Sequence, residues 1–283
     1  MSDITCTLAA LGLHPVKSCG ALAPREALLV ETGFDLDRAW MVVDPQGEML
    51  TQREHPKLAL VKPTLRLSDL LLKAPGMLGL HLALDAVETP TRVRVWDDIV
   101  KAWDMGNLAA QWFSDYLSTP ARVVRFDPDE TRLADRAWTG EAEAPVEFAD
   151  GFPLLVASLD SLGDLNRRLA EAGAAPVTMA RFRPNLVLSG LQPWDEDHLD
   201  LLEIDTDDGP VRLKLVKPCS RCQIPNVDPT TGEMQGEPGR TLAGFRGDAR
   251  VNGAVTFGMN AIVLDGAGCT LRAGKTVRAS FAV

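Results

Sequence analysis

The chain is poor in the residues and patterns that build several classes of protein. Its 283 residues include five cysteines, an odd number without the spacing of a disulfide framework, which favours reduced thiols. No run of about 20 apolar residues is present, so we expect no membrane span. The first residues lack the basic and apolar regions of a secretory signal. Together these absences predict a cytoplasmic protein.

Basic charge is scarce as well. The chain has 29 lysines and arginines against 39 aspartates and glutamates, a net charge of −10 at pH 7. A phosphate backbone binds to a basic face, so nucleic acid is not an expected partner. Apolar residues make up 46% of the chain, which is enough for a sizeable core and suits two domains or one large one.

A motif with two thiols stands out in the second half of the chain. The alternating run 211–216 predicts a strand, and Pro218 is expected to end it because proline has no backbone donor for the ladder. Cys219 and Cys222 would then lie on a loop at the mouth of a sheet, where functional residues are commonly placed. The sequence at 228–232 is typical of a turn just beyond them.

The spacing of these thiols leaves several interpretations open. A structural zinc site needs about four nitrogen or sulfur ligands, but the other cysteines form no second pair and the four histidines are scattered. A redox-active dithiol prefers a helix N-terminus, and Pro225 and Pro229 argue against a helix here. The two thiols could also be small side chains packed under a loop. Finally, one thiolate could bind a soft or high-valent metal that arrives inside a cofactor.

Most of the remaining patterns predict strands. Short apolar runs separated by turns indicate strands at 7–11, 27–30, 39–43, 57–61, 93–96, 99–103, 122–126, 154–156, 186–190, 261–264 and 277–283. The sequence predicts two long helices, one after Asp104 with an apolar stripe and one capped by Ser158 and ending at Gly173. We therefore expect a mixed α/β, β-rich fold with two barrel-like domains, since barrels leave no exposed sheet edges.

The segment 127–147 separates the two halves. It is acidic, contains alanine, proline and glycine, and has no clear periodicity. We interpret it as a linker between domains at 1–126 and 148–283.

Two further segments carry residues suited to binding an anion. Lys17 and Ser18 stand before a glycine in a turn-like segment, a weak signal taken alone. Arg183 and Asn185 stand at the mouth of a predicted strand, where they offer a fork of donors and an amide. These side chains are candidates for an anionic ligand.

Arg38 and Arg53 flank a predicted hairpin whose turn lies at 44–47. The two arginines would therefore meet near one end of its strands. By default each would pair with a nearby carboxylate such as Asp37 or Glu54. An anion bound between them is the alternative.

The thiol motif resembles that of a known family. Cys219-Ser220-Arg221-Cys222 followed by 227–232 is similar to the signature of MOSC domains, which resemble the C-terminal part of molybdenum cofactor sulfurases. The chain resembles mitochondrial amidoxime-reducing components and their bacterial relatives within this family. Segments 15–20, 37–40, 51–53 and 182–185 also match family motifs in order. One loop departs, because Gly151 and Phe152 replace small hydroxylated residues before Pro153, so contacts from it are expected through the backbone.

The resemblance implies a fold and a cofactor. Residues 1–126 would form a MOSC N-terminal β-barrel domain, and residues 148–283 the MOSC domain. The cofactor would be molybdenum–molybdopterin, with Cys222 as the catalytic residue and the single cysteine thiolate on the metal. The residues expected to bind the cofactor are Lys17, Ser18, Arg38, Arg53, Arg183, Asn185, Ser220 and Arg221.

The resemblance also implies an activity. It predicts a molybdenum-dependent reductase of N-hydroxylated small molecules, namely amidoximes, hydroxylamines or N-oxides. Electrons would come from a separate ferredoxin- or cytochrome b5-type protein with its reductase, because the chain has no cysteine set for an iron–sulfur cluster. The alternative is a carrier or binding module for the cofactor or for sulfur, without turnover of its own.

Overall fold

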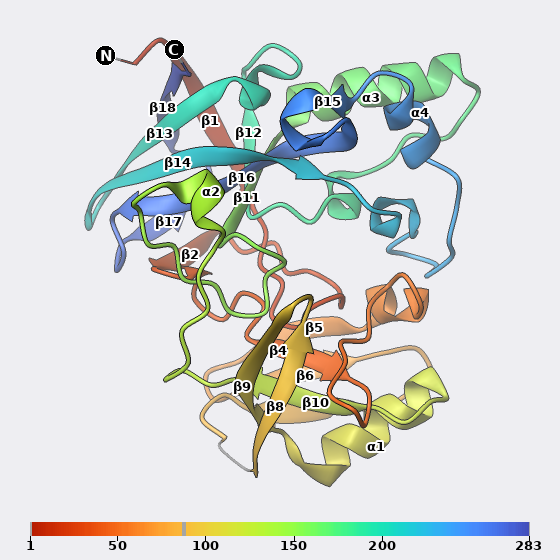
Figure 1. The fold of residues 1–283 in the computed structure, drawn as a ribbon. Coiled ribbons are helices and arrows are strands. Elements are labelled where there is room, and N and C mark those ends of the chain that lie inside the picture. The colour runs from red at the N-terminus through yellow and green to blue at the C-terminus, as the bar shows by residue number, and fades with distance from the viewer. Residues whose placement is uncertain (1, 87–88, 283) are drawn as a thin grey trace.

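The computed structural model describes residues 2–86 and 89–282, which form two stacked halves (Figure 1). One half is built around a β-barrel, and the other holds two small sheets and a long helix. The four α-helices among the described residues are α1 (Gly106–Leu117), α2 (Arg136–Thr139), α3 (Leu159–Glu171) and α4 (Gly239–Ala243). The 3₁₀ helices are η1 (Pro56–Leu60), η2 (Met179–Arg181), η3 (Asp195–Asp197), η4 (Ile224–Asn226) and η5 (Ala249–Val251).

The barrel is a closed ring of seven strands, with one short strand added outside it. The strands, in spatial order, are β11 (Leu154–Ser158), β12 (Leu186–Ser189), β1 (Ile4–Leu11), β18 (Thr276–Phe281), β13 (Leu199–Thr206), β14 (Gly209–Ser220), β16 (Ala254–Asp265) and the added β15 (Gly247–Asp248). Pairing of β11 with β16 closes the ring among the described residues. Side chains that alternate along the strands fill the interior of the barrel: Val211, Leu213 and Leu215 of β14 are buried in its core.

The first strand of the chain belongs to this barrel. Strand β1 lies between β12 and β18 and pairs antiparallel with both. Its side chains Leu8 and Leu11 are buried in the barrel core. The domain boundary predicted at 127–147 stays a prediction. The barrel nevertheless includes β1, a strand that precedes this boundary in the sequence.

The other half contains the residues from β4 to β10. One sheet has the order β4 (Trp40–Val43), β10 (Arg122–Phe126), β9 (Asp98–Asp104) and β8 (Thr89–Val95), and a second consists of β5 (Lys62–Leu65), β6 (Asp69–Lys73) and β7 (Leu80–Ala83). Helix α1 packs its apolar stripe, including Trp112 and Phe113, against a core shared with the two sheets. The expected helix is confirmed, but Leu108, which its spacing placed in the apolar stripe, is 77% exposed.

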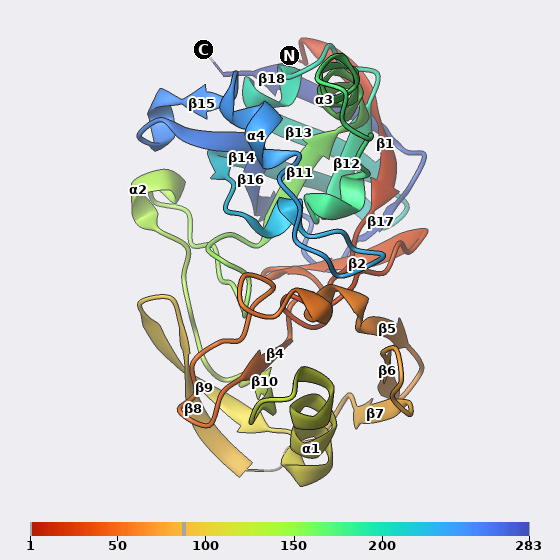
Figure 2. The same ribbon diagram turned by 90° about the vertical axis from the view of Figure 1, so that its right-hand side faces the viewer.

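A third small sheet joins chain segments from both ends of the sequence. It has the order β17 (Thr270–Arg272), β2 (Glu26–Val30) and β3 (Gly33–Phe34). The segment 127–147 passes between the halves and contains α2 (Figure 2). Its Val146 is buried, so this segment packs against the protein instead of crossing open solvent.

Two local predictions were wrong. Residues 57–61 were expected as a strand but form η1, because Pro56 occupies the first helical turn, where a fixed φ and a missing donor are tolerated. Pro218 was expected to end its strand, yet β14 continues to Ser220. The pairing of β14 with β16 is irregular on both sides of Pro218, and such a bulge tolerates a residue without a backbone donor.

The described helices are all too short or too polar to cross a membrane.

Candidate functional site

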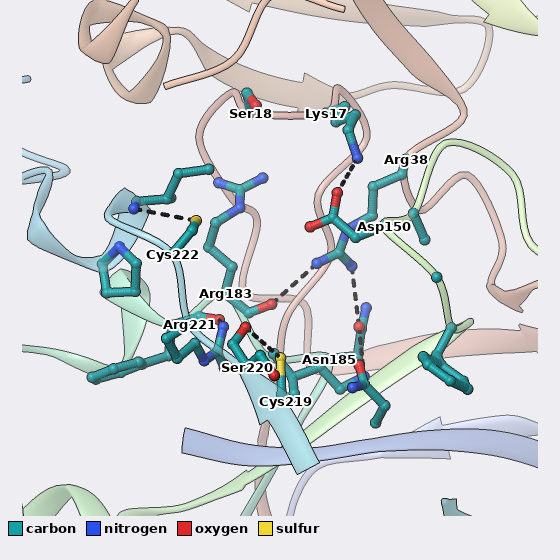
Figure 3. A pocket seen from close by; sticks show the side chains of 18 of the residues that line it. Lys17, Ser18, Arg38, Asp150, Arg183, Asn185, Cys219, Ser220, Arg221 and Cys222 are labelled. Carbon is teal, nitrogen blue, oxygen red and sulfur yellow. Dashed lines mark hydrogen bonds and ion pairs between the residues drawn. The ribbon is translucent and has the colours of Figure 1, made fainter. Parts of the chain in front are cut away.

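One pocket between the two halves is lined by all nine residues predicted from the sequence (Figure 3). They are Lys17, Ser18, Arg38, Arg53, Arg183, Asn185, Ser220, Arg221 and Cys222. Lys17, Ser18 and Arg38 come from the chain between β1 and β4, Arg53 comes from the half with the two small sheets, and the other five come from the barrel half. The topology therefore brings together residues that lie up to about 200 positions apart, and the two arginines that flank the 44–47 turn do meet here.

Three of these residues have a backbone conformation that L-amino acids rarely adopt. Ser18, Arg38 and Arg183 have φ values of 65°, 55° and 57°. A left-handed conformation costs about 1–2 kcal/mol per residue, so the surrounding contacts hold each one in place. Such strain clusters at functional sites, and here it marks three of the pocket's polar residues.

A buried network fixes Arg38. Its guanidinium donates to Asp37, to Asn185 Oδ1 at 3.0 Å and to the Arg183 carbonyl at 3.1 Å. Burial would raise the pKa of Asp37, but Arg38 and His14 outweigh it and lower that pKa to about 2. Asp37 therefore stays charged and anchors Arg38 at the pocket wall.

Asn185 supports the site from within the protein. Its Oδ1 accepts from Arg38 and from the Leu155 backbone N–H at 3.1 Å, and its Nδ2 donates to the Gly12 carbonyl at 3.2 Å and to Asp37 at 2.9 Å. All four bonding positions of the amide are thus used. Its predicted role as a direct cofactor contact stays a prediction, and its observed role is to orient Arg38.

The pocket also contains a carboxylate that the sequence analysis missed. Asp150 accepts from Lys17 Nζ at 2.5 Å and from Trp96 Nε1 at 3.2 Å. Partial desolvation by the pocket wall raises the pKa of Asp150, whose side chain is 69% exposed, but Lys17 and two nearby arginines outweigh it and lower that pKa well below its usual range. It immediately precedes Gly151 and Phe152, so the loop expected to act only through its backbone supplies a charged side chain.

Two pocket arginines keep most of their donors free. Arg183 donates to the Cys19 carbonyl, and the Arg53 guanidinium carbon lies 4.7 Å from the centre of the Trp96 ring. Within residues 2–86 and 89–282, neither arginine forms an ion pair with a carboxylate. Burial and Arg38 lower the pKa of Arg183 only to about 10, so it remains charged at neutral pH. The expected pairing of Arg53 with Glu54 is not observed.

Two other arginines support the thiol loop. Arg221 donates to the Phe257 carbonyl at 2.8 and 3.0 Å and to the Phe182 carbonyl at 3.0 Å. Arg181, which the sequence analysis did not select, donates to the Pro225 and Asn226 carbonyls and pairs with Asp228 at 3.1 Å. These contacts fix the chain around both cysteines. A role of Arg221 in binding a ligand directly stays a prediction.

The charge of the pocket is opposite in sign to that of the chain. The cationic lining residues are Lys17, Arg38, Arg53, Arg181, Arg183 and Arg221. Among the described lining residues the single carboxylate is Asp150. An excess of cations with free donors in one concave site is the arrangement that binds an anion such as phosphate.

The two thiols have different surroundings. Cys222 is exposed, and its sulfur accepts from the Ile224 backbone N–H at 3.5 Å. Cys219, which was expected on a loop, is the penultimate residue of strand β14 and is partly buried, and burial raises its pKa despite the nearby Arg221. Across the described part of the chain, no group of three or more His, Cys, Asp or Glu side chains is arranged to hold a metal ion. Cys222 is thus the more accessible thiol of the pocket.

Comparisons with known proteins agree with the sequence motifs. Residues 5–120 match the MOSC N-terminal beta barrel domain, and residues 143–278 match the MOSC domain. The chain is 36% identical over 252 residues to mitochondrial amidoxime reducing component 2 of Rattus norvegicus, covering 85% of this chain and 72% of that protein. It is 36% identical over 253 residues to mitochondrial amidoxime-reducing component 1 of Homo sapiens, with the same coverage.

A longer relative matches as well. Molybdenum cofactor sulfurase of Danio rerio is 30% identical over 271 residues, covering 90% of this chain but 32% of that protein. The two matched domains stand in order and together span most of the chain, and the amidoxime-reducing relatives align across both of them. On these grounds the chain belongs to the MOSC family.

Proposed function

We propose that this protein is a molybdenum-cofactor-dependent reductase of N-hydroxylated compounds, such as amidoximes, hydroxylamines and N-oxides. The observation that carries the proposal is the position of Cys222, an exposed thiol in a pocket lined by cationic side chains. The relatives named amidoxime-reducing components support the reaction class. The relative named molybdenum cofactor sulfurase supports the link to this cofactor.

The residues of the pocket fit such a cofactor. A pterin with a terminal phosphate requires cationic donors, and Arg53 and Arg183 have donors without carboxylate partners among the described residues. Ser18 and Ser220 add hydroxyl groups to the lining. The metal of such a cofactor would need one protein thiolate, and the Cys222 thiol lies at the same pocket. When bound, the group would supply the metal centre that takes oxygen from nitrogen and passes two electrons to the substrate.

The protein's own residues would bind and orient the ligand in the pocket. Asp150 remains a carboxylate at neutral pH because Lys17 and nearby arginines lower its pKa, so it accepts hydrogen bonds and does not act as a general acid. It holds the Lys17 ammonium group at the pocket wall together with the Phe148 carbonyl, which accepts from Lys17 at 2.8 Å. Arg38, fixed by Asp37 and Asn185, adds a positive charge whose position is set before a ligand arrives.

The two electrons for each turnover would come from a separate redox protein. A ferredoxin- or cytochrome b5-type donor, a cytoplasmic location and a small-molecule substrate remain predictions. The second candidate function is transfer of sulfur or cofactor without turnover, which the match to a molybdenum cofactor sulfurase favours.

One experiment separates the two candidates. Protein produced in a host that makes molybdopterin is purified, and molybdenum, pterin and zinc are measured per chain. The reductase proposal predicts about one molybdenum and one pterin per chain, and reduction of benzamidoxime by a strong chemical donor. Protein from a host without molybdopterin is the matched control and should fold but not turn over. Loaded protein that releases sulfur to cyanide and reduces no substrate supports the carrier. Stoichiometric zinc without pterin contradicts both.

A further inference from the structure

The turn between β8 and β9 has an unusual residue at its first position. Val95 pairs with Asp98, so Trp96 and Asp97 form a two-residue turn. Such turns need a positive φ at the first position, where glycine, asparagine or aspartate is preferred. Trp96 occupies it with a φ of 57°. A large aromatic residue is thus held in a conformation that a smaller residue would adopt at lower cost.

This tryptophan lies at the rim of the cationic pocket. Its Nε1 donates to Asp150 at 3.2 Å, and its ring lies against the Arg53 guanidinium at 4.7 Å. Both partners line the pocket. The hairpin of β8 and β9 carries the turn toward the barrel half (Figures 1 and 2). Trp96 therefore connects the two halves across the edge of the site.

Two contacts fix the ring while much of its surface stays open. The hydrogen bond holds one edge of the indole and the guanidinium covers part of the ring, yet Trp96 is 42% exposed. An aromatic ring that is already immobilised loses little conformational entropy when a ligand stacks on it. The polar lining can bind an anionic group, whereas Trp96 offers an apolar surface next to it.

From this geometry we propose that Trp96 is a specificity-determining residue that stacks on the planar group of the substrate and favours aryl over alkyl N-hydroxylated compounds. The inference rests on the proposed reductase function and names the substrate class of that site. Stacked aromatic pairs contribute enough to change a substrate preference by roughly three- to tenfold. The strained turn places the indole next to the pocket residues Arg53 and Asp150.

The test compares variants of the cofactor-loaded protein on two substrates, benzamidoxime and acetamidoxime. Trp96→Asn removes the ring, and asparagine suits a positive φ, so the hairpin should fold. Trp96→Phe keeps a ring. Ile99→Ala is the matched control, because Ile99 is exposed on the same hairpin but, unlike Trp96, forms neither the hydrogen bond to Asp150 nor the contact with Arg53. The readouts are kcat and KM for each substrate, and molybdenum and pterin per chain.

The expected result is a change in the ratio of the two kcat/KM values. Trp96→Asn should lower the aryl-to-alkyl ratio roughly three- to tenfold, mainly through KM for benzamidoxime. Trp96→Phe should keep most of the preference, Ile99→Ala should keep all of it, and cofactor content should match the parent. An unchanged ratio in Trp96→Asn overturns the inference. So does an equal loss on both substrates with loss of molybdenum, which would mean that Trp96 acts only through Arg53.

Binding distinguishes failure of this inference from failure of the reductase proposal. Benzamidoxime is titrated into the parent and into Trp96→Asn by calorimetry. If the parent binds it more tightly but reduces neither compound, the inference stands and the reductase proposal fails. Equal affinity in the two proteins overturns the inference even if turnover is observed.

Discussion

The arginines of the pocket fall into two groups, according to whether their guanidinium donors contact the protein or remain available to a ligand. The Arg221 guanidinium is engaged by the carbonyls of Phe182 and Phe257, whereas Arg53 and Arg183 keep donors available to a ligand. All three belong to family motifs, so their roles differ through their contacts and not through residue type. Loss of Arg221 should displace the thiol loop, whereas loss of Arg53 or Arg183 should weaken anion binding.

The two thiols should respond differently to serine substitution. Cys222→Ser replaces the exposed thiol with a hydroxyl that stays protonated near neutral pH, so benzamidoxime reduction should be abolished while the fold persists. Cys219→Ser should leave substantial activity, since burial raises the pKa of Cys219 and one thiolate completes the coordination. Molybdenum, pterin and turnover are measured for both variants. The opposite pattern would move the metal ligand to Cys219, and equal loss would indicate a working dithiol.

A buried glutamate should make stability depend on pH. Burial raises the pKa of Glu196 from 4.5 to about 7, although Ser161 donates to it at 2.6 Å. The folded state therefore holds a proton on Glu196 between these values that the unfolded state has released. The free energy of unfolding should fall as the pH rises through this window, by an amount on the order of 3 kcal/mol.

The Glu196→Gln variant tests this dependence. Glutamine keeps an acceptor for the Ser161 hydroxyl but cannot ionise. Denaturant unfolding is followed between pH 5 and pH 8 in the parent and the variant. The difference between them isolates Glu196 from other titrating groups, such as the buried His14, whose pKa is lowered to about 3 mainly by burial. Parallel curves would show that Glu196 ionises in the folded protein without cost.

Among the elements, β16 is the strand that closes the barrel, and one glycine permits its approach to β11. Gly258 has a φ of +75°, and a Cβ there would lie 2.5 Å from the Val156 carbonyl oxygen. Gly258→Ala should therefore lower the free energy of unfolding by about 2 kcal/mol or more. The measurement is urea unfolding at constant pH.

A second glycine provides the control for this substitution. Gly163 lies in α3, and a Cβ there would meet no atom within 4 Å. Gly163→Ala should raise the free energy of unfolding by up to about 1 kcal/mol, because alanine has the higher helix propensity. If both variants lose stability equally, the close approach of Gly258 to the Val156 carbonyl is not the reason why alanine destabilises the protein at this position.

Elements with a strong local pattern could be predicted from the sequence, and those decided by distant contacts could not. The Ser158 cap of α3 is observed, with Ser158 accepting from the Asp160 backbone N–H. Residues 57–61 are as apolar as a strand, but their helical turn is set by Pro56 and by packing. In the site, motifs located nine lining residues, yet the internal role of Asn185 depends on partners up to 173 positions away. Asp150 was not selected from the sequence, because it follows an acidic segment and its carboxylate does not stand out from the others there.

The molecule as a whole does not divide at a single point of the sequence. Strand β1 fills the gap between β12 and β18 and buries Leu8 and Leu11 there. Burial of each such side chain stabilises a protein by about 1.5–3 kcal/mol. Without β1 the barrel would also expose two strand edges. The barrel half should therefore depend on the first residues of the chain.

Fragment expression tests this dependence. Residues 148–283 alone should fail to fold cooperatively. A matched fragment that carries residues 3–12 after residue 282, through a short flexible linker, should fold, because Asp3 N donates to the Ala279 carbonyl at 2.8 Å and the strands are antiparallel. Circular dichroism and thermal unfolding are the measurements. Cooperative unfolding of the shorter fragment would contradict the prediction.

The place of β1 in the barrel also has a consequence during synthesis of the chain. Strand β1 is synthesised before the other strands of the barrel, and its neighbour β18 after them. At typical elongation rates the interval is roughly 15–50 s. During this interval β1 is not yet paired with β18. The pocket is also incomplete, because Lys17 and Cys222, which both line it, are far apart in the sequence. The complete pocket therefore forms only after the segment that carries Cys222 has been synthesised, so a ligand that contacts both walls can bind only after that point.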